Sequence, residues 1–487
     1  MNDYQTYSQK FQEYGEVTEI NYPIITAVGL PSAKLQEIVL FENGEKGQII
    51  TLLEEGMKIM LFARNGIKIG SKLARTDSYL MVPLSAELLG NVITPLGDPI
   101  DPKIPPFPAD EYRPIDTPPA GISARQKVSQ PLSTGIALVD IMIPLGKGQK
   151  QLILGDRKTG KSSFALSALK SQMEQGAIAI YAAVGKKKTD IKAIEEFMEQ
   201  GGYKKQMLIV ATSGFDSPGL IFLTPFTAMT IAEYFRDQGK DVVIIFDDLL
   251  THAKFYREFA LLAQNFPGRD SYPGDIFYVH ARLLERAGNF KNDKTGQSSI
   301  SGFPIVETQD GDLTGYIVSN LMSITDGHIF FDSNVFAEGR RPAINIPLSV
   351  TRVGKQTQNT IEKDINRELN SLFSVYEKGE NLSHFGSEMT ESMKSIFNIG
   401  EKVYTLFNQT AGVTMPKEVS LVLFALVWLN ILNDTQSIET ARKNILTKAS
   451  QEDSRLFLRS LLQADNFNGF LKNIKDHKDL VDRLCKG

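Results

Sequence analysis

The stretch QLILGDRKTGKSS at residues 151–163 decides the fold, because an apolar run leads directly into a glycine-rich loop and then into a segment with helical character. The run at residues 152–154 predicts a strand, and GDRKTGKS at residues 155–162 matches the P-loop pattern. Gly155 and Gly160 let the backbone turn tightly enough for successive amide groups to converge on a phosphate, where a Cβ atom would obstruct the turn or the ligand. The sequence therefore predicts a site for the phosphates of a nucleotide.

The second half of the loop carries a cation and hydroxyl groups that suit such a ligand. Lys161 adds a point charge for the β- and γ-phosphates, and Ser162 offers its hydroxyl to magnesium at a helix N-terminus, where the helix dipole favours anions. The predicted nucleotide-binding residues of the loop are Gly155, Asp156, Arg157, Lys158, Thr159, Gly160, Lys161, Ser162 and Ser163.

Composition limits the classes of protein to which the chain can belong. Its 487 residues include 53 Lys and Arg against 57 Asp and Glu, a net charge of −4 that lacks the basic excess of nucleic-acid-binding proteins. The single cysteine, Cys485, excludes a disulfide framework and is typical of a reducing compartment. The longest apolar run, residues 419–432, is too short to span a bilayer and predicts a buried helix. We therefore expect a soluble protein of two or three domains that binds no nucleic acid.

Changes in the spacing of apolar residues and in the frequency of turn residues divide the chain into four parts. After a short tail at residues 1–16, residues 17–83 alternate short β-rich runs with turn signals such as Asn43-Gly44, which predicts a small β-barrel. Residues 84–358 predict an α/β domain. Apolar residues at helical spacing through residues 359–487 predict a helical bundle.

A proline-rich segment runs from residue 95 to residue 131. Proline fixes φ and cannot donate a backbone hydrogen bond, so this density of prolines excludes both a helix and a central strand. We expect the segment to form a strap that crosses a surface of the α/β domain.

Beyond the P-loop, predicted strands at residues 177–183, 206–211 and 242–246 alternate with helical segments, which is the pattern of a parallel α/β sheet. The last of these strands runs directly into Asp247 and Asp248. A buried strand that ends in a carboxylate is what a P-loop site needs to hold the water shell of magnesium. Asp247 is therefore predicted to bind magnesium together with Ser162.

Five stretches of the chain resemble the alpha subunit of the F-type rotary ATP synthase head. The resemblance covers about residues 25–430, and PGRDSYPGDIFYVHARLLERA is specific to alpha because the beta subunit has different residues there. The other stretches are SQPLSTGIALVDIMIPLGKGQKQLILGDRKTGKSS, DVVIIFDDLLTHAKFYRE, ETQDGDLTGYIVSNLMSITDGHIFF and RRPAINIPLSVTRVGKQTQ. The resemblance implies an α/β RecA-like P-loop nucleotide domain with an N-terminal small β-barrel and a C-terminal helical bundle.

The resemblance also implies ligands, partners and a place in the cell. Members of the family bind ATP or ADP with magnesium, and three alpha subunits alternate with three catalytic beta subunits around a gamma-type central shaft. Such a head is cytoplasmic and peripheral to the inner face of the cell membrane, which it meets only through other subunits.

At one position the chain departs from both subunits of the family. In the beta subunit, the strand after the P-loop helix ends in a glycine followed by the catalytic glutamate that polarises water, and alpha subunits usually have glutamine there. Here Gly185 is followed by Lys186. A lysine cannot act as a carboxylate base, and its cation suits a phosphate or a neighbouring acid. We therefore expect no hydrolysis at this site.

The resemblance assigns roles to further residues. Arg352 matches the position from which alpha reaches into the catalytic site of its beta neighbour, where a guanidinium can meet the charge that develops on the transferred phosphoryl group. The residues that match the adenine side of the family's site are Phe336, Arg341, Pro342 and Gln409. A second adenine-facing glutamine of the family corresponds to Ala411 here, which predicts relaxed base selectivity.

Other readings of the chain remain open at this point. A self-contained hexameric RecA-like ATPase should have glutamate in place of Lys186, and an RNA translocase of the same class should have a basic, aromatic barrel face. The short segment before the first strand, together with Lys186, also suits a specialised paralogue, of the kind found in some wall-less bacteria, whose motor is not coupled to ATP synthesis. Residues 1–14 predict too little helix to dock a stator protein of the delta type.

Overall fold

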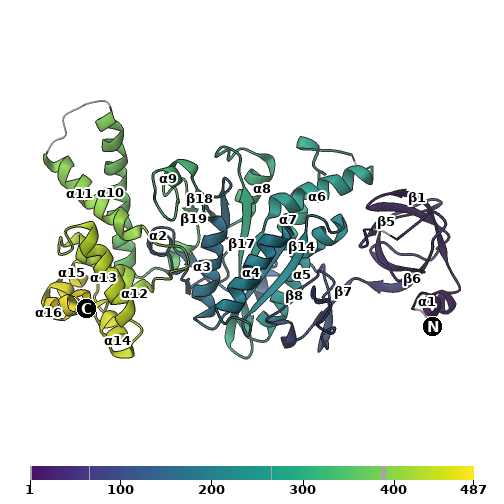
Figure 1. Ribbon diagram of the computed structural model, residues 1–487, viewed down its shortest axis with the longest axis horizontal. Helices are drawn as coiled ribbons and strands as arrows, with labels where there is room; N and C mark the ends of the chain where they lie inside the picture. The colour runs from purple at the N-terminus through teal and green to yellow at the C-terminus, as the bar shows by residue number, and fades with distance from the viewer. Residues whose placement is uncertain (1–2, 65, 265, 385–390, 487) are drawn as a thin grey trace. The chain divides into compact units, whose positions relative to one another are not determined.

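The computed structural model describes residues 3–64, 66–264, 266–384 and 391–486, which Figure 1 colours from purple to yellow along the chain. Contacts divide the chain into two compact units. The first contains Met1–Gln126, Gly176–Glu307 and Asp312–Thr325, and the second contains Lys127–Gln175, Thr308–Gly311 and Asp326–Gly487. The predicted α/β range 84–358 is divided between the two units. The predicted domain limits stay a prediction.

The N-terminal part of the first unit is a closed β-barrel, drawn in purple in Figure 1, with the strand order β1-β2-β5-β4-β3-β6. Alternate side chains point inward and form an apolar core that includes Val17, Ile25 and Val39. The turn between β3 and β4 uses Gly44 at φ +89°. The strands are β1 (Gly15–Asn21), β2 (Ile24–Val28), β3 (Glu37–Phe41), β4 (Lys46–Leu53), β5 (Gly56–Leu61) and β6 (Lys72–Tyr79).

A short helix, α1 (Asp3–Phe11), precedes the barrel and packs against β6. The guanidinium of Arg75 lies 5.1 Å from the centre of the Phe11 ring, which stacks at 6.5 Å on the ring of Tyr7. Residues 1–2 of the predicted tail lie outside the described residues. The described part of the tail therefore contains a short helix that packs against its own barrel.

The rest of the first unit is a parallel sheet with the strand order β17-β15-β13-β14-β8, to which β16 adds an antiparallel edge. Every residue of β14 and β15 is buried, as expected for parallel strands that are covered on both faces. The three predicted strands correspond to β13, β14 and β15 and are confirmed. The strands are β8 (Val92–Ile93), β13 (Ile178–Lys186), β14 (Met207–Ser213), β15 (Val242–Asp247), β16 (Gly288–Asn292) and β17 (Gly296–Glu307). The helices are α4 (Lys188–Gln200), α5 (Pro218–Asp237), α6 (Leu249–Leu262), α7 (Ile276–Leu284) and α8 (Tyr316–Ile324).

The second unit contains the strand and the helix that flank the P-loop. β12 (Leu152–Gly155) leads into the loop, and α3 (Lys161–Met173) follows it, as the sequence predicts. β18 (Gly327–Phe331) pairs with β12 in parallel and with β19 (Val350–Thr351) in antiparallel fashion. The smaller elements are α2 (Ala137–Met142), α9 (Ser333–Ala337), β10 (Pro131–Leu132) and β11 (Leu145–Gly146).

The chain ends in a helical region within the second unit, drawn in green and yellow in Figure 1. All residues from Val419 to Val427 are buried, which confirms the predicted buried helix as α12, although the helix ends at Trp428 and not at the end of the predicted run at residue 432. In the described part of the chain, no helix combines the length and the apolar composition needed to cross a bilayer. The helices are α10 (Thr360–His384), α11 (Glu391–Phe407), α12 (Lys417–Trp428), α13 (Thr435–Lys448), α14 (Glu452–Leu461), α15 (Phe467–Asp476) and α16 (Lys478–Lys486). Barrel, P-loop α/β fold and helical region together confirm the predicted fold class.

The proline-rich strap is held by one short strand and by side chains of the helix beside it. Within the strap, β9 (Glu111–Pro114) pairs with β7 (Met81–Leu84) in a two-stranded sheet. From α5, the hydroxyl of Thr227 donates to the carbonyl of Pro95 at 2.7 Å, and that of Thr230 donates to the carbonyl of Ile115 at 2.9 Å. Side-chain hydroxyls thus satisfy carbonyls of a segment whose prolines contribute no backbone N–H donors.

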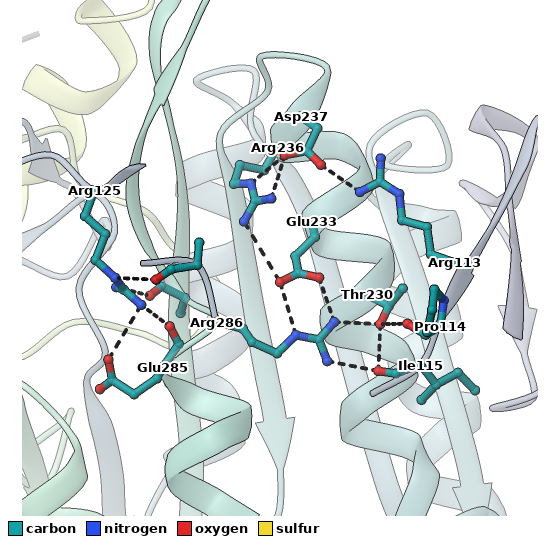
Figure 2. A network of polar contacts seen from close by, with 12 residues as sticks. Arg113, Pro114, Ile115, Arg125, Thr230, Glu233, Arg236, Asp237, Glu285 and Arg286 are labelled. Carbon is teal, nitrogen blue, oxygen red and sulfur yellow. Dashed lines mark hydrogen bonds and ion pairs between the residues drawn. The ribbon is translucent and has the colours of Figure 1, made fainter. Parts of the chain in front are cut away.

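A fully buried arginine completes this attachment, as Figure 2 shows. Arg286, just beyond α7, has 0% exposure, and its Nη1 donates to the carbonyl of Ile115 at 3.0 Å. Its Nε and Nη2 reach the two carboxylate oxygens of Glu233 on α5 at 3.1 and 2.7 Å. This bidentate pair joins α5, α7 and the strap through one side chain.

Candidate functional site

The phosphate-binding loop leaves β12 and enters α3 through two glycines with positive φ. Gly155 has φ +148°, and a Cβ atom there would lie 2.2 Å from the carbonyl oxygen of Phe331. Gly160 is the N-cap of α3 and has φ +104°. An L side chain suits neither position, so the turn requires glycine at both, in agreement with the expectation from the sequence.

Two buried side chains hold the loop in shape. The Nζ of Lys161 donates to the carbonyl oxygens of Gly155 at 2.8 Å and Asp156 at 2.6 Å. The hydroxyl of Thr159 donates to the same Asp156 oxygen at 2.7 Å. Ser162, by contrast, is exposed at the first turn of α3, where its hydroxyl can meet a ligand.

The carboxylate of Asp156 ties the loop to a distant segment of the second unit. It accepts hydrogen bonds from the hydroxyl of Thr308 at 2.6 Å, the backbone N–H of Gly311 at 3.0 Å and the hydroxyl of Ser333 at 2.7 Å. Burial alone would raise the pKa of Asp156, but these hydrogen bonds outweigh it and hold the pKa below its usual range. Sequence reasoning missed Thr308 and Ser333, because no local pattern links them to the loop.

A cavity of about 890 Å³ opens beside the loop, and all of its lining residues belong to the second unit. Its volume lies within the range of small-molecule sites. The predicted site residues that line it are Lys158, Thr159, Gly160, Ser163, Phe336, Arg341, Pro342 and Gln409. Ala411 also lines it, as do Glu439, Arg442 and Lys443 of α13, which the sequence did not single out. The cavity thus brings the end of the P-loop together with the residues expected on the adenine side.

An arginine and an aromatic ring form a flat surface in this cavity. The guanidinium carbon of Arg341 lies 3.5 Å from the centre of the Phe336 ring. The Nη1 of Arg341 also donates to the carbonyl of Phe336 at 2.8 Å, which fixes the guanidinium plane. A fixed guanidinium against an aromatic ring can stack on a planar ligand such as a base.

Gln409 lines the same cavity, but its side-chain amide forms hydrogen bonds with backbone groups. Its Nε2 donates to the carbonyls of Gly135 at 2.7 Å and of Val413, and its Oε1 accepts from the N–H of Ala137 at 3.2 Å. These bonds brace the loop after α11 against the segment before α2. The role of Gln409 in reading adenine stays a prediction, and its hydrogen bonds support a bracing role.

The carboxylate predicted for magnesium lies in the first unit and is paired with a lysine. Asp247 ends β15, and the Nζ of Lys186, at the end of β13, lies 2.6 Å from its Oδ1. The hydroxyl of Tyr181, which the sequence did not single out, donates to Oδ2 at 2.6 Å. Both oxygens of Asp247 therefore have donors. The assignment of Asp247 to magnesium stays a prediction, and its pairing with Lys186 argues against it.

Arg352 follows β19 and is exposed. Its backbone N–H donates to the carbonyl of Asp326 at 2.9 Å, and the neighbouring Thr351 hydroxyl donates to the carbonyl of Pro144, also at 2.9 Å. The backbone at Thr351 and Arg352 is thus held, while the Arg352 side chain is exposed. Arg352 does not line the cavity described above, and its role as an arginine finger stays a prediction.

The P-loop with its cavity, the parallel sheet and the barrel define a nucleotide-binding protein of the RecA-like P-loop class. The family described as the ATP synthase alpha/beta family, nucleotide-binding domain, matches residues 135–351.

Two relatives give the assignment within this class. The chain is 38% identical over 472 residues to the ATP synthase subunit alpha of Neorickettsia sennetsu, which covers 95% of this chain and 91% of that protein. It is 40% identical over 412 residues to the ATP synthase subunit alpha of a Sulfurovum species, which covers 84% of this chain and 81% of that protein. The chain belongs to the family of F-type ATP synthase alpha subunits.

Proposed function

We propose that this chain is the non-catalytic nucleotide-binding subunit of an F-type rotary ATPase head. ATP or ADP binds with its phosphates on the loop at residues 155–163 and its base in the cavity beside Phe336 and Arg341. The magnesium of the nucleotide meets the hydroxyl of Ser162. The shape of the loop, with its two required glycines, and the lining of the cavity support this assignment.

The observation that carries the non-catalytic role is the ion pair of Lys186 with Asp247 at 2.6 Å. Lys186 stands where the family's catalytic subunits have their water-polarising glutamate. Burial alone would lower the pKa of Lys186, but Asp247 and Asp248 outweigh it and raise the pKa above its usual value. A lysine that stays protonated cannot take a proton from water, so this site lacks its general base.

The same proposal includes the partners of the chain. Three copies alternate with three beta-type catalytic subunits around a gamma-type shaft, and Arg352 completes the catalytic site of the neighbouring beta subunit. The head is cytoplasmic, at the inner face of the cell membrane, and contacts the membrane through other subunits. The exposed position of Arg352 and the similarity to alpha subunits over most of the chain support this arrangement.

Purified full-length chain is expected to bind ATP in isothermal titration calorimetry and to release no phosphate from it. Lys161→Ala should weaken ATP binding roughly ten- to hundredfold, because a hydrogen bond to a charged group contributes about 1.5–3 kcal/mol. Lys363→Ala, which removes an exposed lysine of α10, serves as the matched control and should bind as the wild type does. Sustained phosphate release by the chain alone would contradict the proposed function.

A further inference from the structure

Two buried glutamines lie just before β12, the strand that leads into the P-loop. Gln149 is 1% exposed and Gln151 is 0% exposed. An amide side chain buried to this degree costs free energy unless its polar atoms are hydrogen-bonded. The bonding partners of these two side chains lie next to Arg352 in space, and all of them belong to the second unit.

The two amides form a chain of hydrogen bonds that ends on β19. Oε1 of Gln149 accepts from the N–H of Gly146 at 2.9 Å. Nε2 of Gln149 donates to Oε1 of Gln151 at 2.8 Å and to the hydroxyl oxygen of Thr351 at 3.3 Å. Nε2 of Gln151 donates to the carbonyl of Val350 at 3.1 Å. The glutamines therefore hold both residues of β19.

The hydroxyl of Thr351 is fully occupied by this network. It donates to the carbonyl of Pro144 at 2.9 Å, and it accepts from the N–H of Gly354 at 3.1 Å as well as from Gln149. A hydroxyl has one donor and two acceptor sites, so each of them has a partner. A Cβ atom at Gly354 would lie 1.7 Å from the carbonyl oxygen of Pro144, so only glycine permits this close approach.

A second set of bonds reaches Arg352 itself from the residue between the two glutamines. The N–H of Arg352 donates to the carbonyl of Asp326 at 2.9 Å. Asp326 in turn bonds twice to the backbone of Lys150, since its Oδ2 accepts from the Lys150 N–H and its own N–H donates to the Lys150 carbonyl, both at 2.8 Å. Residues 149–151 thus hold the backbone at residues 350–352.

We propose that Gln149 and Gln151 are positioning residues for Arg352. They fix the backbone from which the Arg352 side chain extends, and so they set where its guanidinium lies in the catalytic site of the neighbouring subunit. A misplacement of about 1 Å, caused by a change remote from the chemistry, can cost roughly a hundredfold in rate. This inference rests on the proposed function, because it requires Arg352 to act as an arginine finger.

The test replaces Gln151 by methionine, which has a similar length and lacks the amide. In the head assembled with its beta-type partner, Gln151→Met is expected to lower kcat for ATP hydrolysis roughly ten- to hundredfold and to change KM by less than about threefold. Gln172→Met is the matched control, because Gln172 is 1% exposed and its amide donates to the carbonyl of Ser133 at 2.7 Å, away from β19. It should leave kcat within about threefold of the wild type.

A double-mutant cycle with Arg352→Ala separates positioning from a general structural effect. Once the guanidinium is gone, Gln151→Met has nothing left to misplace, so the double variant should match Arg352→Ala within about threefold. If the two losses multiply instead, Gln151 acts on something other than Arg352 and the inference is wrong. Wild-type kcat in a correctly assembled Gln151→Met complex would also overturn it.

The cycle distinguishes failure of the inference from failure of the proposed function. Unchanged turnover in Arg352→Ala would overturn the finger assignment and the inference together. Loss of turnover in Arg352→Ala without loss in Gln151→Met would overturn the inference alone. If the Gln151→Met complex does not assemble, Thr351→Val takes its place, because it removes the hydroxyl that joins Gln149 to Pro144 and keeps the branched shape. The same results then decide.

Discussion

Arg352→Ala is expected to lower ATP hydrolysis by the assembled head roughly 10³- to 10⁵-fold, the range that arginine fingers contribute in phosphoryl transfer. The side chain is proposed to meet charge that develops only in the transition state, so nucleotide affinity should change much less than the rate. The backbone N–H of Arg352 bonds to the carbonyl of Asp326 at 2.9 Å and does not depend on the side chain. The measurement is phosphate release by the chain assembled with its beta-type partner.

Two further variants separate the finger from a general effect of charge or of assembly. Arg352→Lys keeps the charge but loses the planar fork, so it should recover only a small part of the rate. Lys355→Ala removes an exposed cation three residues away and should leave turnover unchanged. Each complex is first checked for its composition by native mass spectrometry. Unchanged turnover in a correctly assembled Arg352→Ala complex would remove the finger assignment.

The parts of the fold that the sequence predicts best depend on local rules. The P-loop is recognisable because Gly155 and Gly160 stand at fixed spacing between a strand and a helix, and both glycines have the positive φ that this turn requires. The alternation of strands and helices is likewise visible in the periodicity of apolar residues. Buried α12 follows from a continuous apolar run.

The parts that the sequence does not predict depend on contacts between distant segments. Asp156 bonds to Thr308 and Ser333, more than a hundred residues away, and only the folded chain brings them together. The pairing of Lys186 with Asp247 depends on the register of β13 against β15, which a sequence pattern does not specify. The sequence left a phosphate and a neighbouring acid open as partners of the Lys186 ammonium, and the folded chain pairs it with the acid Asp247.

Arg286→Met is expected to destabilise the attachment of the strap by about 3–5 kcal/mol, because among the described residues it leaves the largely buried carboxylate of Glu233 with only Arg236, whose Nη1 lies 4.0 Å from Oε1. Arg286 has 0% exposure, and the Glu233 side chain is 12% exposed. Native-state hydrogen exchange of α5 and α7 measures the effect locally, and their slowest amides should exchange roughly 10²- to 10⁴-fold faster. Arg367→Met, which breaks an exposed ion pair with Asp364 on α10, is the control and should change exchange by less than about tenfold.

A second substitution distinguishes the unpaired charge from lost packing. In the double variant Arg286→Met with Glu233→Met both charges of the pair are removed, and Arg236 keeps its ion pair with Asp237 at 2.6 Å. Most of the lost stability should therefore return, as it does when other buried ion pairs are replaced by apolar residues. The carbonyl of Ile115 keeps the Thr230 hydroxyl at 2.9 Å in both variants and is not left without a donor. If the double variant exchanges as fast as Arg286→Met alone, the stabilisation comes from the packing and the bond to Ile115 rather than from pairing the charge of Glu233. If Arg286→Met exchanges like the Arg367→Met control, the buried pair does not hold the strap at all.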